Sequence, residues 1–305
     1  MSDAVLPAPA WRIEFNGAAQ LKAAVIAALF LLTFSNTIYL LAYVWWNQPA
    51  DWGHGWIIPA FSAYFVHTHW DRIRACPIRF TWVGLAIMVA SLAFYWLNLW
   101  ALRIGYFQSV GMLLCLLGIV IYLCGLPVAR HVWVPWLYLF FAVPLPHGVY
   151  FGLTDPLRQF AANAATVVLR LTGLQIERLG STIEYVYAGT RGKLEVADAC
   201  AGMRSTITLC ALGVAIAFLS ERPWWQRIVM IASCIPIAIF ANFVRVTTTC
   251  ILHVYVDPVY AKGNYHTLLG LASLALAFLM FNALGWLLSH ATPTQEDDEP
   301  EPARP

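Results

Sequence analysis

The sequence has few charged residues: 11% of its 305 residues, against 60% hydrophobic and 14% aromatic. A soluble domain averages about 25% charged residues, so these side chains are too few to cover a body of this size in water. This scarcity excludes an ordinary cytosolic enzyme and a disordered chain. The net charge of +2 also gives nucleic acid no basic surface to bind. The composition therefore indicates a polytopic membrane protein.

The cysteines show no ordered pattern. The seven cysteines form no CxxC motif and follow no regular spacing, which argues against a disulfide framework and a zinc site. Most lie in apolar runs, where a thiol acts as a small packing residue; these are Cys115, Cys124, Cys210, Cys234 and Cys250. No metal or organic cofactor is implied.

Long apolar runs predict about eight transmembrane helices, because a helix needs about 20 residues to cross a bilayer. The predicted fold class is therefore an all-α polytopic membrane protein with a small outer cap. The candidate spans are Leu21–Trp46, Trp52–His69, Thr81–Trp100, Ile104–Gly125, Val132–Tyr150, Met203–Ser220, Ile228–Phe243 and Thr267–Ser289. Gly53, Gly55 and Pro59 make the second run a candidate re-entrant segment.

Basic residues in the connections favour a cytoplasmic N-terminus, because Lys and Arg are retained on the inner side. The cluster Arg72, Arg74 and Arg79 supports this orientation, whereas the long connection 150–199 opposes it with five basic residues outside. The predicted segments are a cytoplasmic stretch (1–20), five spans (21–150), an outer-face loop (151–199), three spans (200–290) and a disordered acidic tail (291–305).

The outer-face loop is the one region with soluble character. Its first half predicts an interfacial helix, with Asp155 as N-cap, Pro156 as first residue, an apolar stripe from Leu157 to Leu171 and Gly173 as the stop. Its second half alternates apolar and polar residues around a Gly-containing turn, which predicts a short hairpin; the apolar positions are Ile183, Tyr185, Tyr187, Leu194 and Val196.

Cys200 differs from the other cysteines in its setting. It follows the predicted hairpin at the water–membrane boundary and precedes the sixth span, with Gly202 and Arg204 just beyond. A helix N-terminus and a nearby cation both favour the thiolate, and Gly202 would let a substrate backbone approach closely. The alternative interpretation is a boundary cysteine without a function.

Arg245 closes the predicted seventh span, and His266 opens the predicted eighth span. A fixed guanidinium suits a carboxylate or a developing oxyanion, and an imidazole suits proton exchange with a cysteine nucleophile. The alternatives are an arginine that extends to the lipid headgroups and an incidental interfacial histidine. With eight spans and the N-terminus inside, both residues lie on the outer face with Cys200.

These residues stand in segments that resemble the exosortase/archaeosortase family. The segments are Ala197–Ser205 (ADACAGMRS), Asn242–Arg245 (NFVR) and the later His266 with Gly270. Asp51–Gly55 with Pro59, and Pro144–Pro146, also resemble family features. One departure is Ala201, where many members have Ser.

The resemblance implies a cysteine peptidase, in particular a transpeptidase, in the cell inner membrane with its active site facing the periplasm or exterior. It implies Cys200 as nucleophile, with Arg245 and His266 as its catalytic partners, and Arg204, Gly202, Asn242 and His54 as supporting residues. Its implied substrates are exported proteins with a C-terminal Pro-Glu-Pro-like motif, a transmembrane helix and a basic end. Membrane lipid and an acceptor nucleophile, water or an amine, complete the implied partners, and nucleic acid is not among them.

Two non-enzymatic interpretations stay open at this point. One is a transporter or flippase-like component of envelope polysaccharide export, which would place ionisable groups near the middle of the membrane. The clearest candidates here stand at the ends of spans. The other is a structural assembly subunit, in which Cys200 would be replaceable by Ser or Ala.

Overall fold

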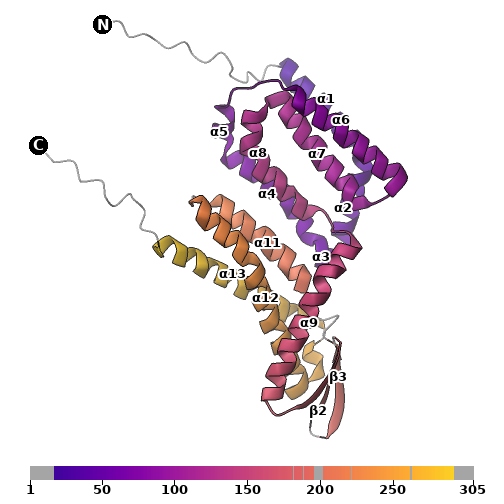
Figure 1. Cartoon of the computed structure of the whole chain (residues 1–305), viewed down its shortest axis with the longest axis vertical. Coiled ribbons are helices and arrows are strands. Elements are labelled where there is room, and N and C mark those ends of the chain that lie inside the picture. Colours follow the sequence, from indigo (N-terminus) through magenta and orange to yellow (C-terminus); the bar gives the residue numbers. More distant parts are fainter. Residues whose placement is uncertain are drawn as a thin grey trace, which may run out of the picture. The chain divides into compact units, whose positions relative to one another are not determined.

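The computed structural model describes residues 17–180, 182–187, 189–195, 202–220, 222–261 and 263–291. These residues form helices and one three-stranded sheet (Figure 1). The chain divides into two compact units, Met1–His147 and Gly148–Pro305. The residues predicted as the cytoplasmic stretch (up to residue 16) and as the acidic tail (from residue 292) lie outside the described ranges.

The first unit is helical throughout its described part. Its elements are α1 (Gly17–Thr33), α2 (Ser35–Asn47), α3 (Pro49–Trp52), η1 (Gly53–Trp56), α4 (Ile57–Thr68), α5 (Trp70–Arg74), α6 (Trp82–Leu97), the π-helical turn η2 (Asn98–Leu102), α7 (Gly105–Cys124), α8 (Leu126–Tyr138) and η3 (Leu139–Ala142). Helices α6 and α7 pack backbone to backbone, because a Cβ at Gly84 would overlap the backbone of Tyr122 and one at Gly118 would lie 2.9 Å from Met88 N. Small residues at membrane helix contacts allow this close approach.

The second unit combines long helices with the sheet. Its elements are α9 (His147–Leu171), β1 (Gln175–Leu179), β2 (Thr182–Tyr187), β3 (Thr190–Glu195), α11 (Gly202–Leu219), α12 (Trp224–Tyr255), η4 (Pro258–Ala261) and α13 (Gly263–Ala291). The sheet is antiparallel with the order β1-β2-β3. Gly189 has a φ of +78°, a left-handed conformation of the kind that tight hairpin turns require.

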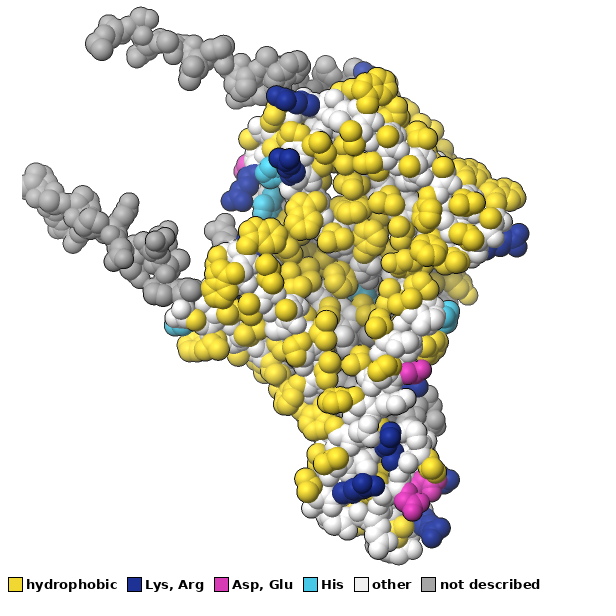
Figure 2. Space-filling view, in the orientation of Figure 1, with side chains coloured by type: hydrophobic (Ala, Val, Ile, Leu, Met, Phe, Trp, Pro, Cys, Tyr) yellow, Lys and Arg dark blue, Asp and Glu magenta, His cyan; other side chains and the backbone are white. Residues whose placement is uncertain are grey.

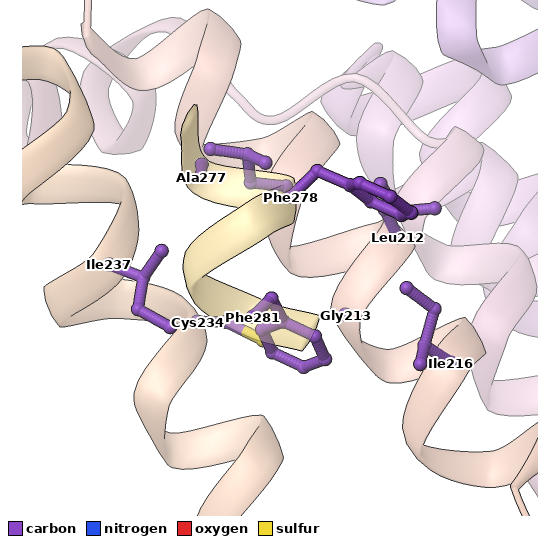
Figure 3. A pocket seen from close by; sticks show the side chains of 9 residues that line it. Leu212, Gly213, Ile216, Cys234, Ile237, Ala277, Phe278 and Phe281 are labelled. Atoms are coloured by element: carbon purple, nitrogen blue, oxygen red, sulfur yellow. The ribbon is translucent and has the colours of Figure 1, made fainter. Parts of the chain in front are cut away.

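Helices α11, α12 and α13 form a bundle whose tightest point is Gly213. A Cβ there would overlap Cys234 Sγ of α12 and lie 3.1 Å from the Phe281 ring of α13. Figure 3 shows these side chains around a small pocket, about 10 Å³ in volume, lined with apolar residues such as Leu212, Ile237 and Phe278. A space of this size holds at most one water and no substrate, so this region is packed core.

The sheet, the second half of α9 and the end of α12 share one hydrophobic core. We call these three segments together the cap. Its buried members are Ala161, Ala162, Ala165, Leu169, Ile176, Ile183, Leu194, Val246 and Cys250. Figure 2 shows charged side chains gathered over this sheet-containing part of the unit, whereas hydrophobic side chains cover most of the visible helical surface. The cap therefore has the character of a soluble domain, and the helices have that of a lipid-facing one.

Among the described residues, four helices are long and apolar enough to cross a membrane. They are Trp82–Leu102, Gly105–Cys124, Trp224–Tyr255 and Gly263–Ala291. Two bent pairs raise the number to six if each is one span, namely Gln20–Thr33 with Ser35–Asn47, bent by 67°, and Leu126–Ala142 with His147–Leu171, bent by 82°. The predicted count of about eight is not confirmed, although several apolar helices and a small cap are present.

Three predicted details differ from the structure. In the region of the predicted fifth span, Val132–Tyr150, the helical segment instead begins at Leu126 and ends at Ala142, ahead of the two prolines Pro144 and Pro146. The interfacial helix begins at His147 rather than at Asp155, so Pro156 lies inside it. The hairpin has a third strand, β1, which the alternating pattern did not indicate.

Candidate active site

Arg245 lies where α12 meets the first turns of α13. Its guanidinium faces Gly270, since a Cβ built on that glycine would lie 3.5 Å from both Cζ and Nη2. The position fits an antiparallel pairing of α12 with α13: further along the two helices, Met230 lies beside Gly285, and Cys234 and Phe281 both lie against Gly213. Arg245 is partly buried, about 30 Å along the helix from Trp224 at 1.5 Å per residue, which is about the thickness of a bilayer core.

The start of α11 reaches the same level of the bundle. Gly213 of α11 packs on Cys234 of α12, and Thr206 lines a cavity of about 10 Å³ with Asn242. Continuing this antiparallel register for one more turn brings Gly202 level with Arg245. Asn242 is only 6% exposed, and among the described residues its buried Oδ1 has no hydrogen-bond partner. Such an acceptor in a water-sized space is unusual, because buried polar atoms are nearly always paired.

The other predicted site residues are described to different extents. Cys200 lies outside the described residues, two positions before Gly202, where α11 begins. Arg204 and His266 have helical backbones in α11 and α13, but their side chains are not described. Residue 266 precedes Gly270 by four positions and therefore stands on the same face of α13, the face that meets Arg245.

His54 belongs to the first unit. It lies in η1, within the predicted span Trp52–His69 but outside the helices that the structure shows to be long and apolar enough to cross a membrane, and its Nε2 is 3.2 Å from the carbonyl oxygen of Phe141. Burial lowers the pKa of this imidazole below its usual 6.5, and the hydrogen bond to Phe141 offsets part of that shift. The hydrogen bond to Phe141 holds His54 against η3 of its own unit.

The opposite end of the bundle is also polar. Arg222 Nη1 donates to the Gly285 carbonyl at 2.8 Å, and Gln226 Nε2 donates to the Leu288 carbonyl at 3.1 Å. Arg227 Nε donates to the Arg222 carbonyl at 2.9 Å. These bonds link the α11–α12 connection to the last turns of α13.

Sequence reasoning missed Thr206 and the packing role of Gly213. Both stand on the α11 face that meets α12, at a helical spacing from Gly202. Small and hydroxyl residues at that spacing are typical of membrane helix interfaces and are the signal in the sequence that would have identified them.

Residues 45–283 match the transmembrane exosortase family. The chain belongs to this family. No curated protein and no solved structure matches it. Membership identifies a multi-pass membrane protein and indicates a membrane transpeptidase role on exported proteins that carry sorting signals. The match spans the Asn242–Arg245 segment, His266 and Gly270, and also Cys200.

Proposed function

We propose that this protein is a membrane cysteine peptidase or transpeptidase that cleaves a C-terminal sorting signal from exported proteins at the outer face of the inner membrane. The observation that carries the proposal is the contact of the Arg245 guanidinium with Gly270, level with the start of α11. Two residues span at most about 7 Å, so covalent connectivity keeps Cys200 close to that start. The face of α13 that meets Arg245 also carries residue 266.

The proposed reaction has two steps. Cys200 Sγ attacks the scissile carbonyl, its proton passes to His266, and Arg245 donates hydrogen bonds to the oxyanion. The C–N bond then breaks, the His266 proton goes to the leaving amine, and a thioester remains. Water or an acceptor amine attacks the thioester, the C–S bond breaks, and the thiol regains its proton through His266.

The proposal is tested by processing of a reporter in cells. The full-length chain is co-expressed with an exported reporter that ends in a Pro-Glu-Pro-like motif, an apolar helix and basic residues. We expect a shortened reporter with the wild-type chain and a full-length reporter with Cys200→Ala, judged by immunoblot and intact mass. Equal processing in both strains, or none with the wild-type chain, contradicts the proposal.

The proposed sidedness has its own test. A membrane-impermeant maleimide added to intact spheroplasts is expected to label Cys200, and a tag after Pro305 is expected to stay protected. Labelling of Cys200 only after permeabilisation would place the site on the cytoplasmic face and overturn the predicted orientation.

A further inference from the structure

Strand β3 is an open edge of the cap sheet. The strand order is β1-β2-β3, and within the described part of the chain β3 pairs with β2 alone. An edge strand presents a row of backbone N–H and C=O groups that a further strand can join. One face of the sheet is anchored, because Ile183 and Leu194 are buried in the cap core and the Tyr185 ring covers Gly192. The packing of this face therefore holds the β3 edge in place.

This edge leads toward the proposed nucleophile. Strand β3 ends at Glu195, five residues before Cys200. Five residues span at most about 18 Å, so Cys200 lies within that distance of the end of β3 and within reach of a peptide bound along this strand. Strand β1, the other edge, has no such connection, because it follows α9 and precedes β2.

The charges on β3 suit a peptide with a carboxylate. Lys193 Nζ is already paired with Glu184 of β2, at 2.7 Å from Oε1. Arg191 is exposed, stands opposite Val186 in the register, and forms no ion pair among the described residues. Charges on an edge strand discourage association with a second copy of the same chain. The same guanidinium attracts an acidic side chain on an added strand.

We propose that the substrate binds in extended form along β3, as a fourth strand of the cap sheet, with an acidic side chain facing Arg191. Backbone hydrogen bonds to the edge would supply affinity, and the Arg191 pairing would set the register. This inference rests on the proposed function, because it names how the same site takes its peptide.

Cysteine cross-linking tests the pairing. Lys193→Cys is combined with Cys200→Ala in the full-length chain, and single cysteines are moved along the reporter beside its cleavage site. Copper phenanthroline then oxidises neighbouring thiols to disulfides. We expect cross-links at every second reporter position, because alternate residues of a strand share one face. Glu177→Cys is the matched control, since Glu177 lies in the same cross-strand row on β1, at the opposite edge.

The outcomes separate this inference from the proposed function. A reporter that the wild-type chain cleaves, but that cross-links without a period of two or equally well to Glu177→Cys, overturns strand addition and leaves the proposed function intact. A reporter that is never cleaved overturns both. As a second readout, Arg191→Glu is expected to raise the KM for the reporter about tenfold with kcat nearly unchanged. Replacing the acidic side chain of the reporter with Lys is expected to restore the low KM of this variant. An unchanged KM contradicts the assigned role of Arg191.

Discussion

The two ends of the α12–α13 pair each place an arginine against a glycine of α13, but in different surroundings. At the Arg222 end, the guanidinium donates to the Gly285 carbonyl and Gln226 donates to the Leu288 carbonyl. At the Arg245 end, the guanidinium faces Gly270, and one turn earlier the buried Oδ1 of Asn242 has no hydrogen-bond partner in the part of the chain that the structure describes. Hydrogen bonds to two backbone carbonyls of α13 close the first end, whereas the second end places a guanidinium and a buried amide where the bundle meets the cap.

We infer from this difference that Arg222 has a structural role, and we propose Arg245 as the arginine of the reaction. Arg222 closes the bundle, because its bonds join the α11–α12 connection to α13. Arg245 stands about one bilayer thickness away, where α12 leaves the three-helix bundle and enters the cap. A site between a membrane bundle and a soluble cap suits a substrate that is part membrane helix and part exported chain.

The largest expected effect is at the nucleophile near the Arg245 end. Cys200→Ala is expected to lower reporter processing at least about 10⁴-fold, because no thioester can form. Cys210→Ala is the matched control, since Cys210 packs against Cys234 inside the bundle, and it is expected to process within about threefold of wild type, as a buried packing change costs stability rather than chemistry. Equal loss in both variants would make Cys200 a packing residue.

The second largest effect is expected at His266. His266→Gln keeps a polar side chain but removes proton exchange, so processing is expected to fall about 10³-fold. A hydroxylamine trap for the thioester should show slower acylation, because the leaving amine lacks its proton donor. Normal processing by this variant would assign the proton exchange to another group, with His54 the first to replace.

The two arginines give the next contrast. Arg245→Lys keeps the charge but loses the planar fork of donors, so turnover is expected to fall about 10²-fold with an unchanged melting temperature in detergent. Arg222→Lys is expected to show the reverse, with turnover per folded molecule unchanged and unfolding easier by about 1 kcal/mol through lost backbone hydrogen bonds. Similar behaviour of the two variants would remove the distinction drawn between the two ends.

The sequence predicted best those elements that have one uninterrupted apolar run. The run Ile104–Gly125 became α7, Gly105–Cys124, because neither charge nor proline interrupts it. The seventh span was cut at Phe243, although α12 continues to Tyr255. Arg245 ends the apolar run there, but the helix continues because its next turns bury Val246 and Cys250 in the cap. Hydropathy indicates which part of a helix is surrounded by lipid, but it does not indicate where the helix ends.

The cap was only partly predictable. Strands β2 and β3 alternate apolar and polar residues clearly, whereas β1 buries only Ile176 within a five-residue strand that also carries Glu177 and Arg178. On α9 the predicted apolar stripe included Phe160 and Val167, which are more than half exposed, and the buried face is instead lined by alanines such as Ala162. Small residues bury well in a close helix contact, and a scale of hydrophobicity alone underestimates them.

The residues of the candidate site were proposed from the sequence, and that proposal stays a prediction; their arrangement in space could not be predicted. The family-like segments singled out Arg245, His266 and Gly270 in the sequence. The contact between Arg245 and Gly270 depends on the antiparallel register of α12 and α13, which is fixed by packing at distant points such as Gly213. No local pattern carries that information.

The smallest expected effect comes from adding one methyl group at each end. An alanine Cβ at Gly285 would lie 3.3 Å from Arg222 Nη2, so the guanidinium must shift and its bond to the Gly285 carbonyl lengthens. An alanine Cβ at Gly270 would lie 3.5 Å from Arg245, an ordinary contact. Replacing glycine by alanine within a helix gains about 0.5–1 kcal/mol when no contact is disturbed.

We therefore expect Gly270→Ala to unfold slightly later than wild type and to process the reporter within about threefold, because the added contact leaves the guanidinium in place. Gly285→Ala is expected to gain no stability, since the shift of Arg222 offsets the helical preference. Gly270→Leu provides the contrast on the same residue, because its larger side chain displaces the guanidinium and should lower processing about as far as Arg245→Lys does. If Gly270→Leu processes normally while remaining folded, the position of Arg245 against α13 has no part in the reaction, and the arginines at both ends are structural.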